Sequence, residues 1–272
     1  SIVPTAATWG EFNLGVTQFY LRQNLADNRV QYAIGKIFAP NFVNPYPFFD
    51  DNRQFFNQTF STSPTIASPL RGFGAVVAWF PFTGKGYYVQ GGMYTANSDD
   101  TGLTIDDFFK TGEHFYHVDL GWSVLAHQGV PIQARGPMDA ANFHVVGWFK
   151  NEQPGLPQAN GVAFNASTKV ASDFLVFLRG GASVGFFTDA NLSAGFGWRP
   201  PRYPSDLFGF GSGWVRPSNR ALREQQTHEM FYRFHLTDNL ALSPDVQLVL
   251  NPAVNPTEEL IWLLGFRTRV TF

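Results

Sequence analysis

Apolar and polar side chains alternate with a period of two residues along most of the chain. In the last segment, Leu260–Phe272, one parity is almost wholly apolar, while the other is small and then cationic at Arg267 and Arg269. The segment before it, Leu240–Leu250, repeats the scheme, with leucine and valine opposite small and polar residues. Because successive side chains of a β-strand point to opposite faces of a sheet, this pattern predicts strands rather than helices.

Similar alternation marks about twelve candidate strands. In chain order they are Phe12–Leu25, Arg29–Phe38, Gly72–Phe82, Gly86–Ala96, Glu113–His127, Ala140–Lys150, Ser172–Phe187, Ala190–Arg199, Asp206–Arg216, Met230–Leu236, Leu240–Leu250 and Leu260–Phe272. Short connections, such as Ala26–Asn28, Phe82–Lys85 and Thr188–Ala190, take turns with long ones, such as Ala39–Arg71 and Asn151–Ala171. The arrangement predicts an all-β fold, a transmembrane antiparallel β-barrel with short periplasmic turns and long extracellular loops.

The composition decides between lipid and a protein core as the environment of the apolar faces. A soluble β-sandwich or barrel alternates too, but its surface carries about 25% charged residues. Here only 15% are charged, while 17% are aromatic, including 29 Phe, so lipid is favoured. No apolar run reaches the roughly 18 residues of a membrane-spanning helix. The net charge of -2 argues against nucleic acid as a partner, and the absence of cysteine excludes disulfides and thiolate chemistry.

Three motifs near the end of the chain resemble a known family. They are EMFYRFHL at 229–236, LSPDVQLVLNP at 242–252 and LGFRTRVTF at 264–272. Together, in this order, they are similar to the end of the OprB family of carbohydrate-selective porins. The early hairpin, from Phe19 to Gly35 and Lys36, resembles the family hairpin that ends in Gly followed by Lys or Arg.

The resemblance implies a non-enzymatic porin of the Gram-negative outer membrane that lets small sugars diffuse passively, without a cofactor. It also implies contact with membrane lipid and lipopolysaccharide, and it leaves homotrimer and monomer open. The family barrel is sixteen-stranded, so residues 1–272 are interpreted as a single porin domain that lacks its N-terminal strands, a smaller barrel being the alternative. A general diffusion porin and an outer-membrane lipid hydrolase are the alternative functions.

In a porin the working surface is the lumen, and alternation selects the side chains expected to line it. The charged candidates are Arg29, Asp173, Arg179, Glu229, Arg233, His235, Asp245, Arg267 and Arg269, and the aromatic ones include Tyr94 and Trp148. Charged groups can hydrogen-bond sugar hydroxyls, and Arg presents several donors in a fixed fork. Aromatic rings can stack on the apolar face of a sugar. The charges can alternatively neutralise one another and stiffen the wall.

The long connection Ala39–Leu70 is rich in aromatic residues and too apolar to remain in solvent. We expect it to fold inward and narrow the pore, an external cap being the alternative. Catalytic and metal motifs are absent from the sequence: it has no Gly-x-Ser-x-Gly or P-loop. His114 and His117 would point to opposite faces of a strand, so they cannot share a metal ion.

Overall fold

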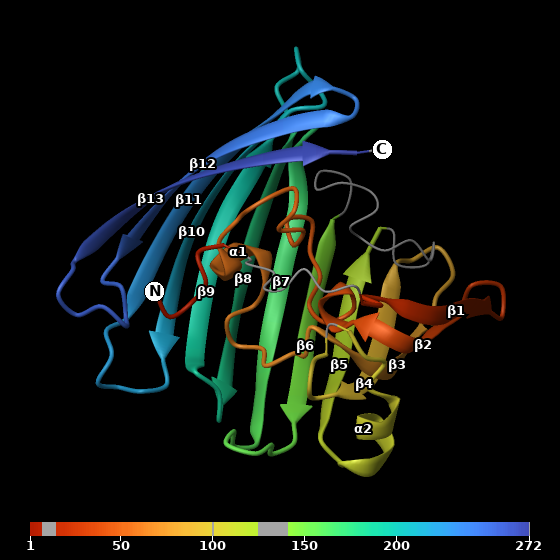
Figure 1. Ribbon diagram of the computed structural model, residues 1–272. Helices are drawn as coiled ribbons and strands as arrows, with labels where there is room; N and C mark the ends of the chain where they lie inside the picture. Colours follow the sequence, from red (N-terminus) through yellow and green to blue (C-terminus); the bar gives the residue numbers. More distant parts are fainter. Residues whose placement is uncertain (7–14, 100, 125–140, 272) are drawn as a thin grey trace.

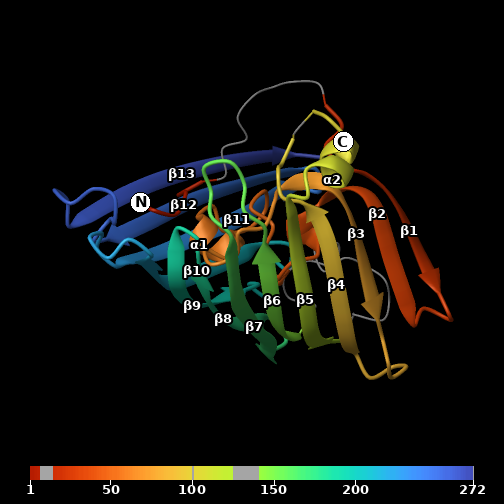
Figure 2. The ribbon, with the colours of Figure 1, turned by 90° about the horizontal axis from the view of Figure 1, so that it is seen from below.

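The computed structural model describes residues 1–6, 15–99, 101–124 and 141–271. These residues form one antiparallel sheet of thirteen strands, each hydrogen-bonded to the next along the chain (Figure 1). The strands are β1 Phe19–Leu25, β2 Val30–Phe38, β3 Arg71–Trp79, β4 Tyr87–Thr95, β5 His114–Ser123, β6 Asn142–Lys150, β7 Ala159–Ala171, β8 Phe174–Val184, β9 Thr188–Trp198, β10 Leu207–Pro217, β11 Gln225–Thr237, β12 Leu240–Leu250 and β13 Leu260–Val270. The sheet curves around a concave side (Figure 2). The all-β antiparallel prediction is therefore confirmed.

The connections differ between the two ends of the sheet. The turn end carries tight connections at residues 26–29, 172–173 and 238–239. The loop end carries connections that include residues 39–70 and 251–259. The turn end also carries the connections 80–86, 124–141 and 199–206, so the division into short periplasmic turns and long extracellular loops typical of outer-membrane barrels holds only in part.

The prediction of a loop at Asn151–Ala171 was wrong, because its second half is strand β7. The buried face of β7 consists of small residues such as Ala163 and Ser167, and its outward face mixes Val162 and Phe164 with polar residues. The contrast between the two faces is therefore too weak to be recognised as alternation.

The turn predicted at Thr188–Ala190 was wrong as well, since these residues begin β9. The chain turns at residues 185–187 instead, where Gly185 has φ 79° and a Cβ would lie 2.1 Å from the Gln158 carbonyl oxygen. Only glycine fits this position. The turn lies at the loop end, so that end also has a tight connection.

Some predicted strand ends lie outside the described residues: the start of Phe12–Leu25, the end of Glu113–His127 and the first residue of Ala140–Lys150. The C-terminal Phe272 lies outside them too.

The convex face of the sheet is apolar, with Leu264, Phe266 and Trp262 between 62 and 84% exposed. A row of aromatic residues crosses β8 to β11 near the turn end, where Phe174, Trp198, Phe208 and Tyr232 are register neighbours. A second group near the loop end includes Tyr116, Phe149, Trp214 and Trp262.

Along β10, Phe208 and Trp214 of the two groups lie about 20 Å apart at 3.3 Å per residue. Aromatic girdles on both sides of an apolar band mark the membrane-spanning zone of a barrel. Among the described residues, no helix combines the length and apolar character needed to cross a bilayer.

Residues 39–70, which we call the inner loop, occupy the concave side of the sheet (Figures 1 and 2). The inner loop contains the short helices η1 Ala39–Asn41 and α1 Gln58–Ser61. Its aromatic side chains form a buried cluster with the wall. The members are Tyr46, Phe48, Phe49, Phe55 and Phe60 of the loop, and Leu175, Phe177, Leu207 and Phe231 of the strands. The prediction that this segment folds inward is confirmed. A further helix, α2 Ile105–Lys110, packs on β3 through Phe73 and Phe108, whose ring centroids are 5.3 Å apart.

Three glycines of β10 make room for the inner loop and for Phe231 of β11. A Cβ on Gly209 would lie 2.3 Å from the Phe231 ring, one on Gly211 2.8 Å from the Phe60 ring, and one on Gly213 2.5 Å from a methyl of Thr59. Since none of these distances accommodates a side chain, the glycines form the groove into which α1 and its aromatic neighbours pack.

Candidate pore lining and constriction loop

Arg179 of β8 lies on the concave side, as predicted, but its guanidinium group binds the inner loop. Nη1 donates to the carbonyl oxygens of Phe60 and Thr62 at 2.8 and 2.7 Å, and Nη2 donates to that of Asn44 at 3.4 Å. The group also stands 3.8 Å from the centre of the Tyr46 ring, and the residue is only 3% exposed. Arg179 therefore anchors the loop rather than facing an open lumen.

Glu229 of β11 and Asp245 of β12 belong to a buried hydrogen-bond network that holds the middle of the loop. The Glu229 carboxylate accepts the backbone N–H groups of Phe56 and Asn57 at 2.5 and 3.0 Å. The Asn57 amide donates to Gln247 Oε1 at 2.9 Å, and Gln247 donates in turn to Asp245 Oδ1 at 2.9 Å. Asn57 also caps α1 by accepting the Thr59 N–H. One carboxylate thus fixes the backbone at the point where α1 begins.

Arg267 and Arg233 hold the loop from two other strands. Arg267 of β13 donates to the carbonyl oxygens of Asp51 and Gln54 at 2.6 and 2.9 Å. Arg233 of β11 donates to the carbonyl oxygen of Arg53 at 3.1 Å. Backbone carbonyls satisfy these guanidinium donors without neutralising their charge.

Several arginines gather on the side of the loop nearest the turn end, close to the carboxylates of Asp50 and Asp51. The guanidinium groups of Arg53, Arg199, Arg267 and Arg269 all act electrostatically on Arg233. Arg269 and Arg267 of β13 are both half-buried, and Arg267 differs in the two hydrogen bonds that it donates to the inner loop. The backbone N–H of His235, also predicted to face inward, donates to Asp206 Oδ1 at 2.8 Å, and the ring Nδ1 of His235 lies 3.9 Å from the same oxygen.

Both predicted aromatic candidates lie in a packed cluster. Tyr94 of β4 is fully buried and stacks on His117, and Trp148 of β6 is 4% exposed and stacks on Phe115 at a centroid distance of 5.9 Å. Their rings pack against other rings rather than bordering a space that a sugar could enter.

Two predicted lumen residues lie in turns. Arg29 is in the connection between β1 and β2, where its N–H bonds the Ala26 carbonyl, and Asp173 is in the connection between β7 and β8. Arg29 is exposed and Asp173 is half-buried, and for both residues the predicted alternation extended beyond the end of the strand. Their positions are on the rim at the turn end and not on the wall.

The inner loop borders two adjoining cavities that the sequence did not reveal. One, of about 650 Å³, has charged residues in its lining: Asp50, Asp51, Arg53 and Arg71. The Arg53 Nε atom lies 3.2 Å from Asp50 Oδ2. Burial and the nearby Asp50 raise the pKa of Asp51 to about 6. These loop residues were missed because alternation identifies only the faces of strands. The adjacent acids Asp50 and Asp51, followed by Arg53, were the signal in the sequence that could have indicated a charged site.

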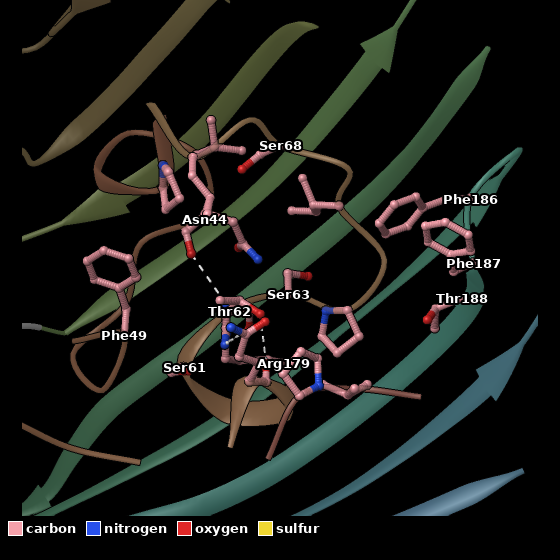
Figure 3. A pocket seen from close by; sticks show the side chains of 18 of the residues that line it. Asn44, Phe49, Ser61, Thr62, Ser63, Ser68, Arg179, Phe186, Phe187 and Thr188 are labelled. Atoms are coloured by element: carbon pink, nitrogen blue, oxygen red, sulfur yellow. Dashed lines mark hydrogen bonds between the residues drawn. The ribbon is translucent and has the colours of Figure 1, made fainter. Parts of the chain in front are cut away.

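The second cavity, of about 350 Å³, lies between the inner loop, the chain start at residues 2–4 and the β8–β9 turn (Figure 3). Its lining is largely neutral. In the part of the chain that the structure describes, no three His, Cys, Asp or Glu residues are close enough together to hold a metal ion.

A membrane-spanning antiparallel sheet with an inward-folded loop on its concave side defines an outer-membrane β-barrel of the porin type. Residues 187–272 match the profile of the carbohydrate-selective porin family OprB. This match confirms the relationship to the OprB family that the terminal motifs predicted. The family is one of carbohydrate-selective porins, which are outer-membrane channels and not enzymes.

Solved structures show the same fold. The high-pH structure of Pseudomonas putida OprB superposes with a TM-score of 0.76 at 14% identity, covering 100% of this chain and 76% of that one. The low-pH structure of the same protein gives a TM-score of 0.61 at 14% identity, over 94% of this chain and 67% of that one. None of the curated proteins compared with the chain matches it.

Proposed function

We propose that this protein admits small sugars to the cell by passive, carbohydrate-selective diffusion, with the inner loop as the constriction. The observation that carries the proposal is the pairing of a rigidly anchored inner loop with cavities on its surface. Four wall residues, Arg179, Glu229, Arg233 and Arg267, hold the loop by bonds to its backbone. Its own polar side chains are thereby left to meet the solute.

The charge arrangement suits a neutral solute. Asp50, Asp51 and Arg53 place both signs on one short stretch of the loop, beside the arginines of β11 and β13. Carboxylates accept and guanidinium groups donate hydrogen bonds, so a sugar with many hydroxyls finds partners of both kinds. A neutral molecule loses no Coulomb energy in a field of mixed sign, whereas an ion meets a repelling group of its own charge.

We further propose that residues 1–272 form one barrel domain whose convex face contacts outer-membrane lipid and lipopolysaccharide. Its apolar band and aromatic girdles are of the type that lipid accommodates.

The deciding test is reconstitution of the purified protein in a planar lipid bilayer. We expect an ohmic ion current that falls as glucose is added, because a sugar in the constriction obstructs ions. A current indifferent to sugars would support the alternative of a general diffusion porin. Absence of any current would overturn the proposal, and lipid hydrolysis by the purified protein would favour the enzyme alternative.

A further inference from the structure

We propose that the 350 Å³ cavity at the loop end is a binding subsite for one neutral sugar ring, separate from the charged cavity beside it. This inference rests on the proposed function and assigns sugar recognition to one place on the inner loop. The cavity lies between the loop and the β8–β9 turn (Figure 3). Its volume is at the lower end of the roughly 300–1,000 Å³ found for small-molecule sites.

The lining offers the two kinds of contact that a sugar ring needs. Hydroxyl groups come from Ser61, Thr62, Ser63, Ser68 and Thr188. The hydroxyls of Ser61, Thr62 and Ser68 already donate to chain carbonyls, and their oxygens can still accept from a sugar hydroxyl. Aromatic faces come from Phe49, Phe186 and Phe187, and the last two form a pair with centroids 5.4 Å apart in the turn. At the rim, Phe187 is 65% and Leu70 39% exposed, so the cavity is open to solvent.

Two buried donors at this cavity have no hydrogen-bond partner. Asn44 is 3% exposed; its Oδ1 bonds the His144 ring at 2.6 Å, while its Nδ2 has no partner. Arg179 is also 3% exposed, and its Nε has no partner although both Nη atoms bind loop carbonyls. Buried donors are normally satisfied, and an unsatisfied one next to a cavity identifies a place for an acceptor. Both residues line this cavity (Figure 3), and a sugar hydroxyl is an acceptor of the right kind.

The two cavities differ in the groups that they offer to a solute. They share the loop residues Pro40, Phe49, Gln58, Ser61, Thr62 and Leu70 in their linings, so they adjoin. The carboxylates of Asp50 and Asp51 belong to the larger cavity alone. Recognition of the sugar and discrimination between ions should therefore be separable by substitution.

The test combines Phe187→Ala with Ser63→Ala in the full chain, in a planar bilayer with glucose as the probe. We expect the glucose concentration that halves the sugar-sensitive current to rise roughly fivefold or more, because a ring contact and a hydroxyl are lost. The reversal potential in a KCl gradient should stay unchanged, because neither substitution removes a charge. Phe109→Ala removes an equally exposed aromatic from α2 at the same end and should leave the glucose block intact.

A second variant, Phe187→Trp, gives a direct reading of binding. Because the chain already has seven Trp, glucose should change the emission of the variant more than that of the wild type, over the concentrations that block the current of the same variant. An unchanged glucose block in the double variant, or an unchanged Trp emission, would overturn the subsite. If the wild-type current itself ignores glucose, the proposed function fails first, so the two failures are distinguishable.

Discussion

Arg179 offers the sharpest test of the idea that the wall acts through the inner loop. Its two short bonds, to the carbonyl oxygens of Phe60 and Thr62, have a charged donor. Such bonds contribute about 1.5–3 kcal/mol each. At the low end of that range for each of the two bonds, Arg179→Met should weaken docking of the loop by about 3 kcal/mol. That is roughly a hundredfold in the ratio of docked to undocked loop.

We expect Arg179→Met to raise the single-channel conductance, to add current noise as the loop leaves the wall, and to weaken glucose block. Limited proteolysis should cut within residues 39–70 of the variant faster than in the wild type. The matched control is Arg216→Met, which removes an arginine of β10 whose guanidinium group binds Asp189 of β9 instead of the inner loop. Wild-type conductance and protease resistance in Arg179→Met would refute the anchoring role.

Three further predictions concern other parts of the constriction. Because the pKa of Asp51 is about 6, well above the usual 3.8, its carboxylate is charged above pH 6 and neutral below, so the reversal potential in a KCl gradient should shift toward anions between pH 7.5 and 5. Asp51→Asn should abolish that shift, and a shift that persists in this variant would contradict the assignment to Asp51. Gly211→Val should displace α1 and lower the temperature at which the barrel unfolds on heated gels, whereas Gly147→Val, with no atom within 4 Å of its Cβ, should not. Arg269→Gln should change only the reversal potential, whereas Arg267→Gln, which loses two hydrogen bonds to the loop, should change the conductance as well. Identical effects of the two substitutions on both quantities would contradict an anchoring role of Arg267 alone.

The fold was largely predictable because a membrane-spanning strand must present apolar side chains to lipid on one face. The alternation predicted for Leu260–Phe272 is observed in β13, where Leu264 on the convex face is 84% exposed and Arg267 lies on the concave face. The rule fails where the contrast disappears. In β7 alanine and serine occupy one face and the other is only partly apolar, and nothing in that pattern separates a strand from a loop.

The candidate site was less predictable than the fold. Alternation correctly turns Arg179, Arg233 and Arg267 toward the concave side, but the period of a strand carries no information about what fills that side. The answer lies in contacts between residues far apart in sequence, such as Glu229 with Phe56 and Asn57. The glycines at 209, 211 and 213 of β10 were a readable signal, because three small residues on one face predict that something packs there.

The anchoring has a consequence for how selectivity can change. A guanidinium group that binds loop carbonyls, as Arg179 and Arg267 do, fixes the position of the loop backbone while leaving its side chains free. Exchange of Asp50, Asp51 or Arg53 alters the surface that meets the solute without removing the bonds that Arg267 and Arg233 make to backbone carbonyls of the same stretch. Exchange of a wall arginine removes one of those bonds and so shifts several loop side chains together. Substitutions on the loop should therefore tune selectivity in small steps, and substitutions on the wall should change conductance and selectivity at once.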